Sequence, residues 1–106
     1  MAHKIQFSPE AQNDLRQIRE YISVDLDNET AAAKTVGKIT KSISILKDMP
    51  EVGTPLSARV DVKCDYRYLV SGNYNVFYRL EDENVKIIRI LNARRNFMAI
   101  LFGKEF

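Results

Sequence analysis

The spacing of apolar and polar residues changes once along the chain, between residues 49 and 62. Before this point, apolar residues recur every three or four positions, as on one face of an amphipathic helix. The first stripe is Ala11, Leu15, Ile18 and Ile22, and the second is Ala32, Val36, Ile39, Ile43 and Leu46. After it, apolar and polar residues alternate, as in strands with one buried face. The pattern therefore predicts two helices followed by a β-sheet.

Capping residues mark where the two helices begin. Residues 4–7 alternate and predict a short strand, after which Ser8 can cap a helix whose first position suits Pro9. Polar residues at 25–28 interrupt the first stripe, so the second helix is expected over about residues 29–47. Two amphipathic helices joined by a short polar turn form a helical hairpin.

The second half of the chain predicts a sheet made of consecutive strands. Residues 49–55 contain the chain's only cluster of proline and glycine and are expected to form a loop. Strands are expected over about residues 63–70, 74–80 and 85–91. Short polar connections between them favour an antiparallel meander. The apolar segment 97–102 is expected to form a short helix that packs back on the fold.

Together these elements predict an α+β fold of order β-α-α-β-β-β. In it, an N-terminal helical hairpin packs on one face of a small antiparallel sheet, and a short C-terminal helix follows. A chain of 106 residues has room for one domain, so residues 1–106 are expected to form a single unit. A core of this size leaves little space for an internal pocket, so function is expected at a surface or a shallow groove.

Arginines are concentrated in the sheet half of the chain. Six arginines and three lysines follow residue 58, whereas two arginines and five lysines precede it. Guanidinium groups suit phosphate and carboxylate partners, so these are candidate binding residues: Arg67, Arg79, Arg89, Arg94 and Arg95. Each could equally pair with a nearby acidic residue such as Asp65, Glu81 or Asp82, and strand parity does not require all five to share a face. The adjacent Arg94 and Arg95, at a strand exit, favour a functional role.

Four tyrosines also cluster in the predicted strands: Tyr66, Tyr68, Tyr74 and Tyr78. Aromatic rings can stack on nucleic-acid bases when they are exposed, but they are also favoured in strands for packing. Because Val76 and Leu80 share the row of Tyr74 and Tyr78, packing is the better interpretation. A regular first sheet strand would place Cys64, Tyr66, Tyr68 and Val70 on one face.

Several classes of enzyme are disfavoured by what the sequence lacks. His3 is the only histidine and lies near the terminus, so no histidine is expected to act as a general base. Cys64, the only cysteine, is expected to be a buried strand residue. No Cys/His cluster or glycine-rich phosphate loop is present, so neither a metal nor a cofactor is expected. Without an apolar leader or a membrane-spanning segment, the protein is expected to be cytoplasmic.

The order of several short motifs resembles the RelE/ParE toxins, especially the ParE branch. The helical half contributes Phe7-Ser8-Pro9-Glu10-Ala11, Asp14-Leu15, Ile18, Tyr21-Ile22, Leu46, Pro50 and Gly53. The sheet half contributes the strand segments 66–70, 74–79 and 85–91 and the closing Asn92-Ala93-Arg94-Arg95-Asn96. The resemblance spans nearly the whole chain, although Asn92 and Asn96 stand where the family often has His and Asp.

Membership of this family implies the toxin half of a bacterial type II toxin–antitoxin system, of the kind associated with plasmid stabilisation. A cognate antitoxin would wrap the toxin in a hetero-oligomer and neutralise it. RelE-type members cut messenger RNA on the ribosome, whereas ParE-type members poison DNA gyrase. A degenerate member would only bind its partner or, as a complex, its own operator.

Individual residues favour the gyrase poison over the nuclease. Asn75 matches the position of the mid-strand catalytic arginine, and the tail 97–102 has no tyrosine. A nuclease would therefore depend on Arg67, Arg94 and Arg95, and without an acid and a base such chemistry would be slow. Candidate target-binding residues are Arg67, Arg79, Arg89, Asn92, Arg94, Arg95 and Asn96. The resemblance thus favours a ParE-like, non-nucleolytic toxin, with a ribosome-dependent endoribonuclease as the alternative.

Overall fold

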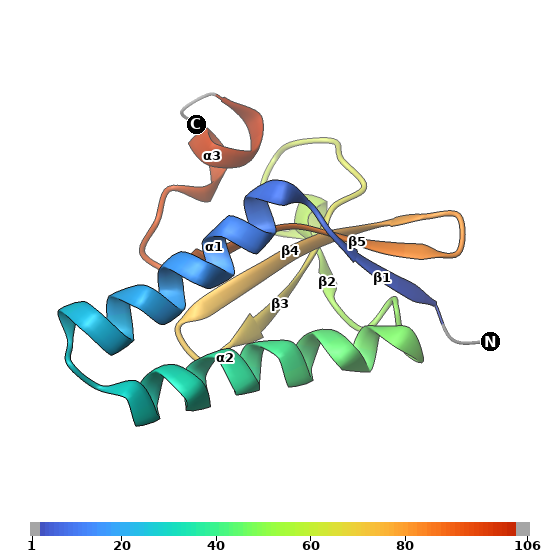
Figure 1. The fold of residues 1–106 in the computed structure, drawn as a ribbon. Helices are drawn as coiled ribbons and strands as arrows, with labels where there is room; N and C mark the ends of the chain where they lie inside the picture. The colour runs from blue at the N-terminus through green and yellow to red at the C-terminus, as the bar shows by residue number, and fades with distance from the viewer. Residues whose placement is uncertain (1–2, 104–106) are drawn as a thin grey trace.

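A computed structural model describes residues 3–103 of the chain. Its helices are α1 (Pro9–Glu20), α2 (Glu29–Ser44) and α3 (Phe97–Phe102). Its strands are β1 (Lys4–Phe7), β2 (Thr54–Pro55), β3 (Arg67–Ser71), β4 (Tyr74–Glu81) and β5 (Asn84–Asn92). The predicted α+β fold is confirmed, including the short C-terminal helix, although one more strand, β2, follows the hairpin than was expected. Figure 1 shows the two long helices running alongside the sheet.

The helical hairpin begins and turns at the residues that the sequence predicts. Ser8 caps α1, because its Oγ accepts a hydrogen bond of 2.9 Å from the backbone N–H of Ala11, and Pro9 takes the first helical position. The Asn28 side chain caps α2 in the same way, accepting from Ala31 at 2.9 Å. Between the helices, α1 widens into a π-helical turn over Tyr21–Asp25.

The sheet has five strands in the order β1-β5-β4-β3-β2. The antiparallel meander is confirmed for β3, β4 and β5, but β1 pairs parallel to β5, with Lys4 opposite Asn84. The expectation of a wholly antiparallel sheet is therefore wrong at this edge. No tight turn joins β1 to its neighbour, because the hairpin and the rest of the sheet lie between them, so its direction is not fixed by a local connection.

The strand expected over residues 63–70 is shorter than predicted, and the preceding loop contributes a strand of its own. β3 begins only at Arg67, and Thr54 and Pro55 pair with it antiparallel as β2. Cys64 is half-buried and lies outside any strand, so its predicted place in one is wrong. Residues 56–66 instead cross the second face of the sheet, where Leu56 donates its N–H to the Tyr66 carbonyl at 2.8 Å.

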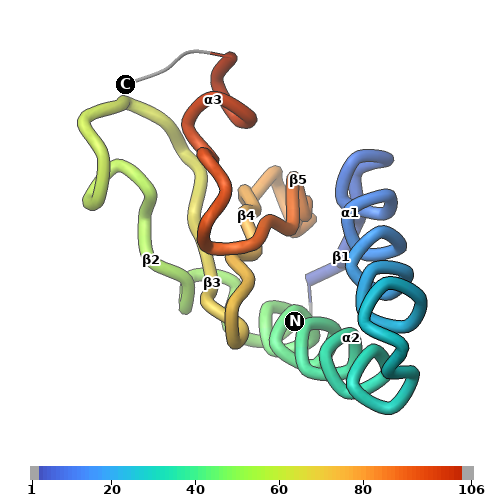
Figure 2. Tube along the Cα trace, turned by 90° about the vertical axis from the view of Figure 1, so that its left-hand side faces the viewer, coloured from blue at the N-terminus to red at the C-terminus, as the bar shows by residue number. Residues whose placement is uncertain are grey.

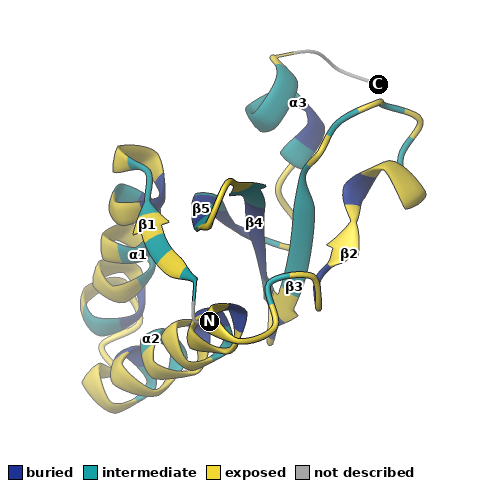
Figure 3. Cartoon of the chain, turned by 90° about the vertical axis from the view of Figure 1, so that its right-hand side faces the viewer, coloured by how far each residue is buried: buried dark blue, intermediate teal, exposed yellow. Residues whose placement is uncertain are grey.

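Two apolar cores lie on opposite faces of the sheet (Figures 2 and 3). The larger is covered by α1 and α2. In the expected row, Val76 and Tyr78 are buried in this core, and Tyr74 and Leu80 are partly buried against it. The smaller lies under α3 and residues 56–66, with Phe77 at its centre. Tyr68 pairs with Phe77 and so belongs to this second face, away from Tyr78.

The expected single face for the first sheet strand is therefore only partly correct. Cys64, Tyr66 and Tyr68 all contact the second core, but Val70 is 64% exposed. Val70 lies at the end of the sheet opposite Asn75, beyond the cover that α3 provides. Packing, rather than exposure for base stacking, accounts for Tyr68 and Tyr78.

Tyr78 ties the loop before β2 to the sheet. Its buried hydroxyl donates to the Pro50 carbonyl at 2.8 Å and accepts from the Gly53 N–H at 2.9 Å. A side chain at Gly53 would not fit, since an added Cβ would lie 2.7 Å from Tyr78 Cε1 and 2.9 Å from the Tyr68 carbonyl oxygen. This close approach explains why a glycine occupies position 53.

Replacing Tyr78 by phenylalanine is expected to lower the free energy of unfolding by about 1–3 kcal/mol, because two buried backbone groups lose their partner.

Burial raises the pKa of the Tyr78 hydroxyl, an effect that its hydrogen bond to Gly53 partly offsets, so folding favours the protonated form. The stabilisation that the protonated Tyr78 hydroxyl provides is complete below its pKa of about 10 in the unfolded chain. It is lost as pH rises through the higher pKa of this hydroxyl in the folded protein. Urea unfolding between pH 8 and 11 should show a steeper alkaline loss in the wild type than in Tyr78→Phe. Parallel profiles would contradict this.

Candidate functional site

The turn between β5 and α3 carries the two arginines that the sequence favoured most. In this arginine turn (residues 92–96), Arg94 and Arg95 are exposed, and neither forms a salt bridge within residues 3–103. Asn92 Oδ1 accepts from the backbone N–H of Arg94 at 2.9 Å, and Asn96 Oδ1 caps α3 by accepting from Ala99 at 3.3 Å. The two asparagines thus fix the turn, and the two arginines project from it.

Arg89 is bound inside the protein by Asp14 of α1. Its Nε and Nη2 donate to the two carboxylate oxygens at 2.7 and 2.8 Å, and the N–H of Ile90 donates to the same carboxylate at 3.0 Å. The side chains of Asp14 and Arg89 are 7% and 23% exposed. The hydrogen bonds to Asp14 raise the pKa of Arg89 above its already high ordinary value, so the guanidinium stays protonated.

Asp14 is a site residue that the sequence pattern did not single out, because it is not one of the apolar residues of the first stripe. The signal was present in the spacing, since Asp14 follows Ala11 by three positions and precedes Ile18 by four. Residues at these spacings share one helix face, so a carboxylate there must face the core and requires a buried cation or backbone donors. Both partners come from β5.

The other two candidate arginines also have partners. Arg67 Nη1 donates to the carbonyl oxygens of Glu51 and Gly53 at 3.1 and 2.8 Å. Arg79 forms an exposed salt bridge of 2.9 Å with Asp65, one of the pairings that the sequence left open. The structure therefore groups Arg94 and Arg95 with Asn92 and Asn96, and separates them from Arg67, Arg79 and Arg89.

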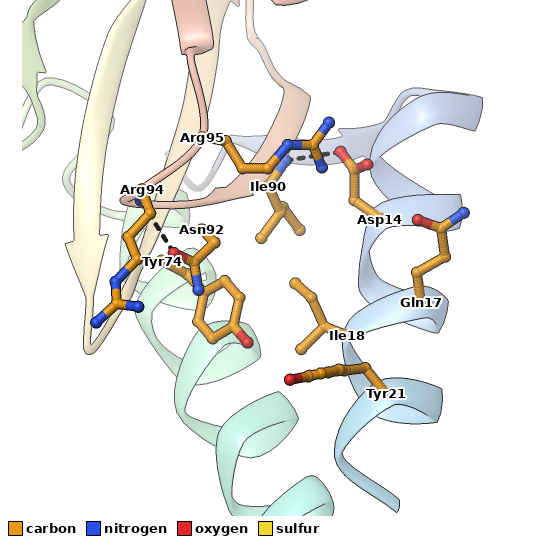
Figure 4. A pocket seen from close by; sticks show the side chains of 9 residues that line it. All are labelled: Asp14, Gln17, Ile18, Tyr21, Tyr74, Ile90, Asn92, Arg94 and Arg95. Carbon is orange, nitrogen blue, oxygen red and sulfur yellow. Dashed lines mark hydrogen bonds between the residues drawn. The ribbon is translucent and has the colours of Figure 1, made fainter. Parts of the chain in front are cut away.

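A cavity of about 490 Å³ opens beside the arginine turn, between α1 and the end of the sheet. Its lining consists of Asp14, Gln17, Ile18, Tyr21, Tyr74, Ile90, Asn92, Arg94 and Arg95. Figure 4 shows Tyr21 and Tyr74 with Ile18 and Ile90 facing the open space. The cavity thus combines aromatic walls, amide groups and two arginines without an internal partner among the described residues.

Within residues 3–103, no group of three or more His, Cys, Asp or Glu side chains is placed to hold a metal ion. In the same part of the chain, no helix is long and apolar enough to cross a bilayer.

A sequence model of the family described as "ParE toxin of type II toxin-antitoxin system, parDE" matches residues 5–97. The chain belongs to this family. It is therefore a ParE/RelE-type toxin of a type II toxin–antitoxin system, and the resemblance drawn from the sequence motifs is confirmed. The matched region of this ParE-family toxin includes the Asp14–Arg89 ion pair and the arginine turn. No curated protein sequence gives a match.

Solved structures share the fold of this ParE-family toxin. One, described as the chromosomal ParDE toxin–antitoxin system from P. aeruginosa, aligns with a TM-score of 0.71 and 21% identity over 86% of this chain and 96% of that chain. Another, the toxin–antitoxin complex RelBE2 from Mycobacterium tuberculosis, aligns with a TM-score of 0.57 and 19% identity over 87% and 99% of the two chains. At these identities the likeness concerns the fold alone.

Proposed function

We propose that this toxin inhibits growth by poisoning DNA gyrase and that a cognate antitoxin neutralises it. The observation that carries the proposal is which arginines are bound inside the protein and which are exposed. Of the three that a nuclease would use, Arg67 is bound to the backbone carbonyls of Glu51 and Gly53. The remaining two, Arg94 and Arg95, are exposed on one turn and suit binding to an anionic surface.

The groups that would cleave RNA are poorly placed. Asn75, at the position of the family's mid-strand catalytic arginine, is only 6% exposed. His3 precedes β1, whose Lys4 pairs with Asn84 at the start of β5, whereas the arginine turn follows the end of that strand. At about 3.3 Å per residue, the two ends of β5 are roughly 26 Å apart. A histidine at that distance cannot take a proton from a 2′-hydroxyl bound at Arg94 and Arg95.

The proposal of an antitoxin partner draws on the complexes to which this fold is similar. The M. tuberculosis neighbour is a toxin–antitoxin complex, and the P. aeruginosa neighbour belongs to a ParDE system. A partner of this chain would cover apolar side chains left exposed on the hairpin, of which Val24 and Leu26 are 66% and 56% exposed. We expect the antitoxin to be encoded next to the toxin.

When the toxin is incubated with gyrase, ATP and supercoiled plasmid, we expect linear DNA that is covalently linked to gyrase to accumulate. Replacing both Arg94 and Arg95 by alanine should raise the toxin concentration needed by at least about tenfold, because truncating a hot-spot arginine costs about 2 kcal/mol or more. Agarose gels run after detergent and protease treatment measure the linear product. The matched control is the Lys34→Ala/Lys38→Ala variant, which removes the same charge from exposed positions of α2.

Three results would count against this function. Supercoiling that is unchanged across a toxin titration would reject gyrase as the target. Truncated messages in a translating extract, lost in Arg95→Ala, would assign the chain to the nuclease branch instead. Harmless overexpression without the antitoxin would identify a degenerate member that only binds its partner.

A further inference from the structure

The cavity beside the arginine turn has the properties of a ligand site. Its volume of about 490 Å³ lies within the roughly 300–1,000 Å³ of typical ligand pockets. It is open to solvent at one end of the molecule, between the last turns of α1 and the point where β4 begins and β5 ends (Figure 4). The proposed action on gyrase assigns no ligand to this cavity.

The walls of the cavity offer two aromatic rings. Tyr21 is the first residue of the π-helical turn, and its side chain is large, apolar over most of its surface and 48% exposed. Turns of this kind are often found at functional sites. Tyr74 begins β4, and Figure 4 shows its ring directed into the same space from the other side. The two rings lie in different planes in Figure 4, so a flat aromatic ligand stacked on one ring would meet the other at its edge.

The charge of the cavity is positive. Asp14 lines it, but its carboxylate already accepts three hydrogen bonds, two of them from Arg89, and is thereby neutralised. Arg94 and Arg95 have no such partner within residues 3–103. The side-chain Oδ1 of Asn92 accepts a hydrogen bond from the backbone N–H of Arg94, which leaves the side-chain NH₂ of Asn92 as a donor. The ligand that fits is therefore an anion as well as an aromatic.

We propose that this pocket binds one nucleotide of single-stranded DNA, with the base stacked on Tyr21 and bordered by Tyr74, and with the phosphates on its two sides held by Arg94 and Arg95, whose guanidinium groups point to different sides of the cavity in Figure 4. Aromatic platforms beside arginines are the usual means of binding single strands without sequence preference. An acidic peptide would use the arginines but leave the two rings without a role. The inference rests on the proposed function, since a toxin that traps gyrase on cut DNA would meet unpaired nucleotides at the break.

The test is the affinity of the full-length toxin for a short fluorescent oligothymidylate, measured by anisotropy across a range of salt concentrations. Tyr21→Ala should weaken binding by about 5- to 150-fold, the loss of one stacking platform, and Tyr21→Phe should restore it. Arg94→Ala should reduce the slope of log affinity against log salt by about 0.7 to 1, the release of one phosphate contact. Lys38→Ala is the control for charge alone.

Several outcomes would overturn the inference. If Arg94→Ala and Lys38→Ala lose the same affinity for oligothymidylate, or if Tyr21→Ala leaves that affinity unchanged, then DNA is bound by the overall positive charge of the surface and not by the pocket. Tighter binding of oligouridylate would reject DNA as the ligand, and displacement of the probe by a polyglutamate peptide at lower concentration than by unlabelled oligothymidylate would identify an acidic peptide. The same variants are assayed with gyrase. If Tyr21→Ala still poisons gyrase, only the proposed role of the pocket is rejected. If the wild-type toxin binds oligothymidylate but does not poison gyrase, only the gyrase proposal is rejected.

Discussion

Replacing Asp14 by alanine is expected to lower the free energy of unfolding by about 3–5 kcal/mol, the cost of removing one partner of a buried ion pair. The carboxylate is 7% exposed and joins α1 to β5 through two bonds from Arg89 and one from the backbone of Ile90. Its removal leaves the Arg89 guanidinium, 23% exposed, without a counter-ion. Urea unfolding followed by circular dichroism measures the change.

Two further variants separate the ion pair from other effects of the substitution. Glu20→Ala removes a carboxylate from an exposed position of the same helix and should change stability by no more than about 0.5 kcal/mol. The double variant Asp14→Ala/Arg89→Met should recover part of the loss, because a buried pair replaced by apolar residues is often nearly neutral. If Asp14→Ala lowers the free energy of unfolding by less than about 1 kcal/mol, or if the double variant recovers none of the lost stability, then the ion pair contributes little to stability.

The ion pair also bears on function, because it lies directly before the arginine turn. Arg89 and Ile90 are held to α1 a few residues before Arg94 and Arg95 leave the sheet. The same carboxylate lines the cavity to which those arginines contribute. We therefore propose that Asp14 is a positioning residue for the arginine turn, and we expect Asp14→Ala to lose the proposed gyrase poisoning at temperatures where it is still folded.

The helices and the last two strands were predictable because their signals are local. The stripes through Ala11 and Ile39, the caps Ser8 and Asn28, and the alternation from Tyr74 to Leu80 each depend on residues within a few positions of one another. Such patterns are set by the period of a helix or a strand and need no knowledge of the rest of the fold. The elements formed where these signals placed them.

The environment of the arginines could not be predicted in the same way. Arg89 and Asp14 are separated by 75 positions, and Arg67 is bound by carbonyl oxygens of a loop that no local pattern places beside it. A guanidinium in a strand is equally compatible with solvent, an acidic neighbour or a ligand. Arg94 and Arg95 were favoured because they are adjacent and follow the last strand, which is a local argument.

The second face of the sheet was the least predictable part of the fold. Cys64 and Tyr66 alternate with polar residues as a strand would, yet the chain there crosses the sheet as an irregular segment. Cys64 and Tyr66 are partly buried because they pack in the second core with Leu56 and with residues of α3, which lie elsewhere in the sequence. Strand alternation reports which residues are buried, and an irregular segment can bury the same residues.

Phe77→Ala is expected to destabilise the protein by about 3–5 kcal/mol, the usual cost of removing a buried phenylalanine side chain. Phe77 is 1% exposed at the centre of this second core, with ring centroids 5.3 Å from Phe97 and 6.3 Å from Tyr68. Val70→Ala is the control on the neighbouring strand, because Val70 is 64% exposed and its loss should cost no more than about 0.5 kcal/mol.

Phe77→Ala should also release α3 before the rest of the molecule unfolds. A helix of six residues is not stable in water without tertiary packing, and Phe97, its first residue, packs on Phe77. Hydrogen exchange should therefore show faster exchange over Phe97–Phe102 in the variant while β4 and β5 remain protected. Because the arginine turn lies between β5 and α3, freeing α3 removes one of its two anchors and should weaken gyrase poisoning. Unchanged exchange in α3 would mean that contacts other than Phe77 hold this end of the site.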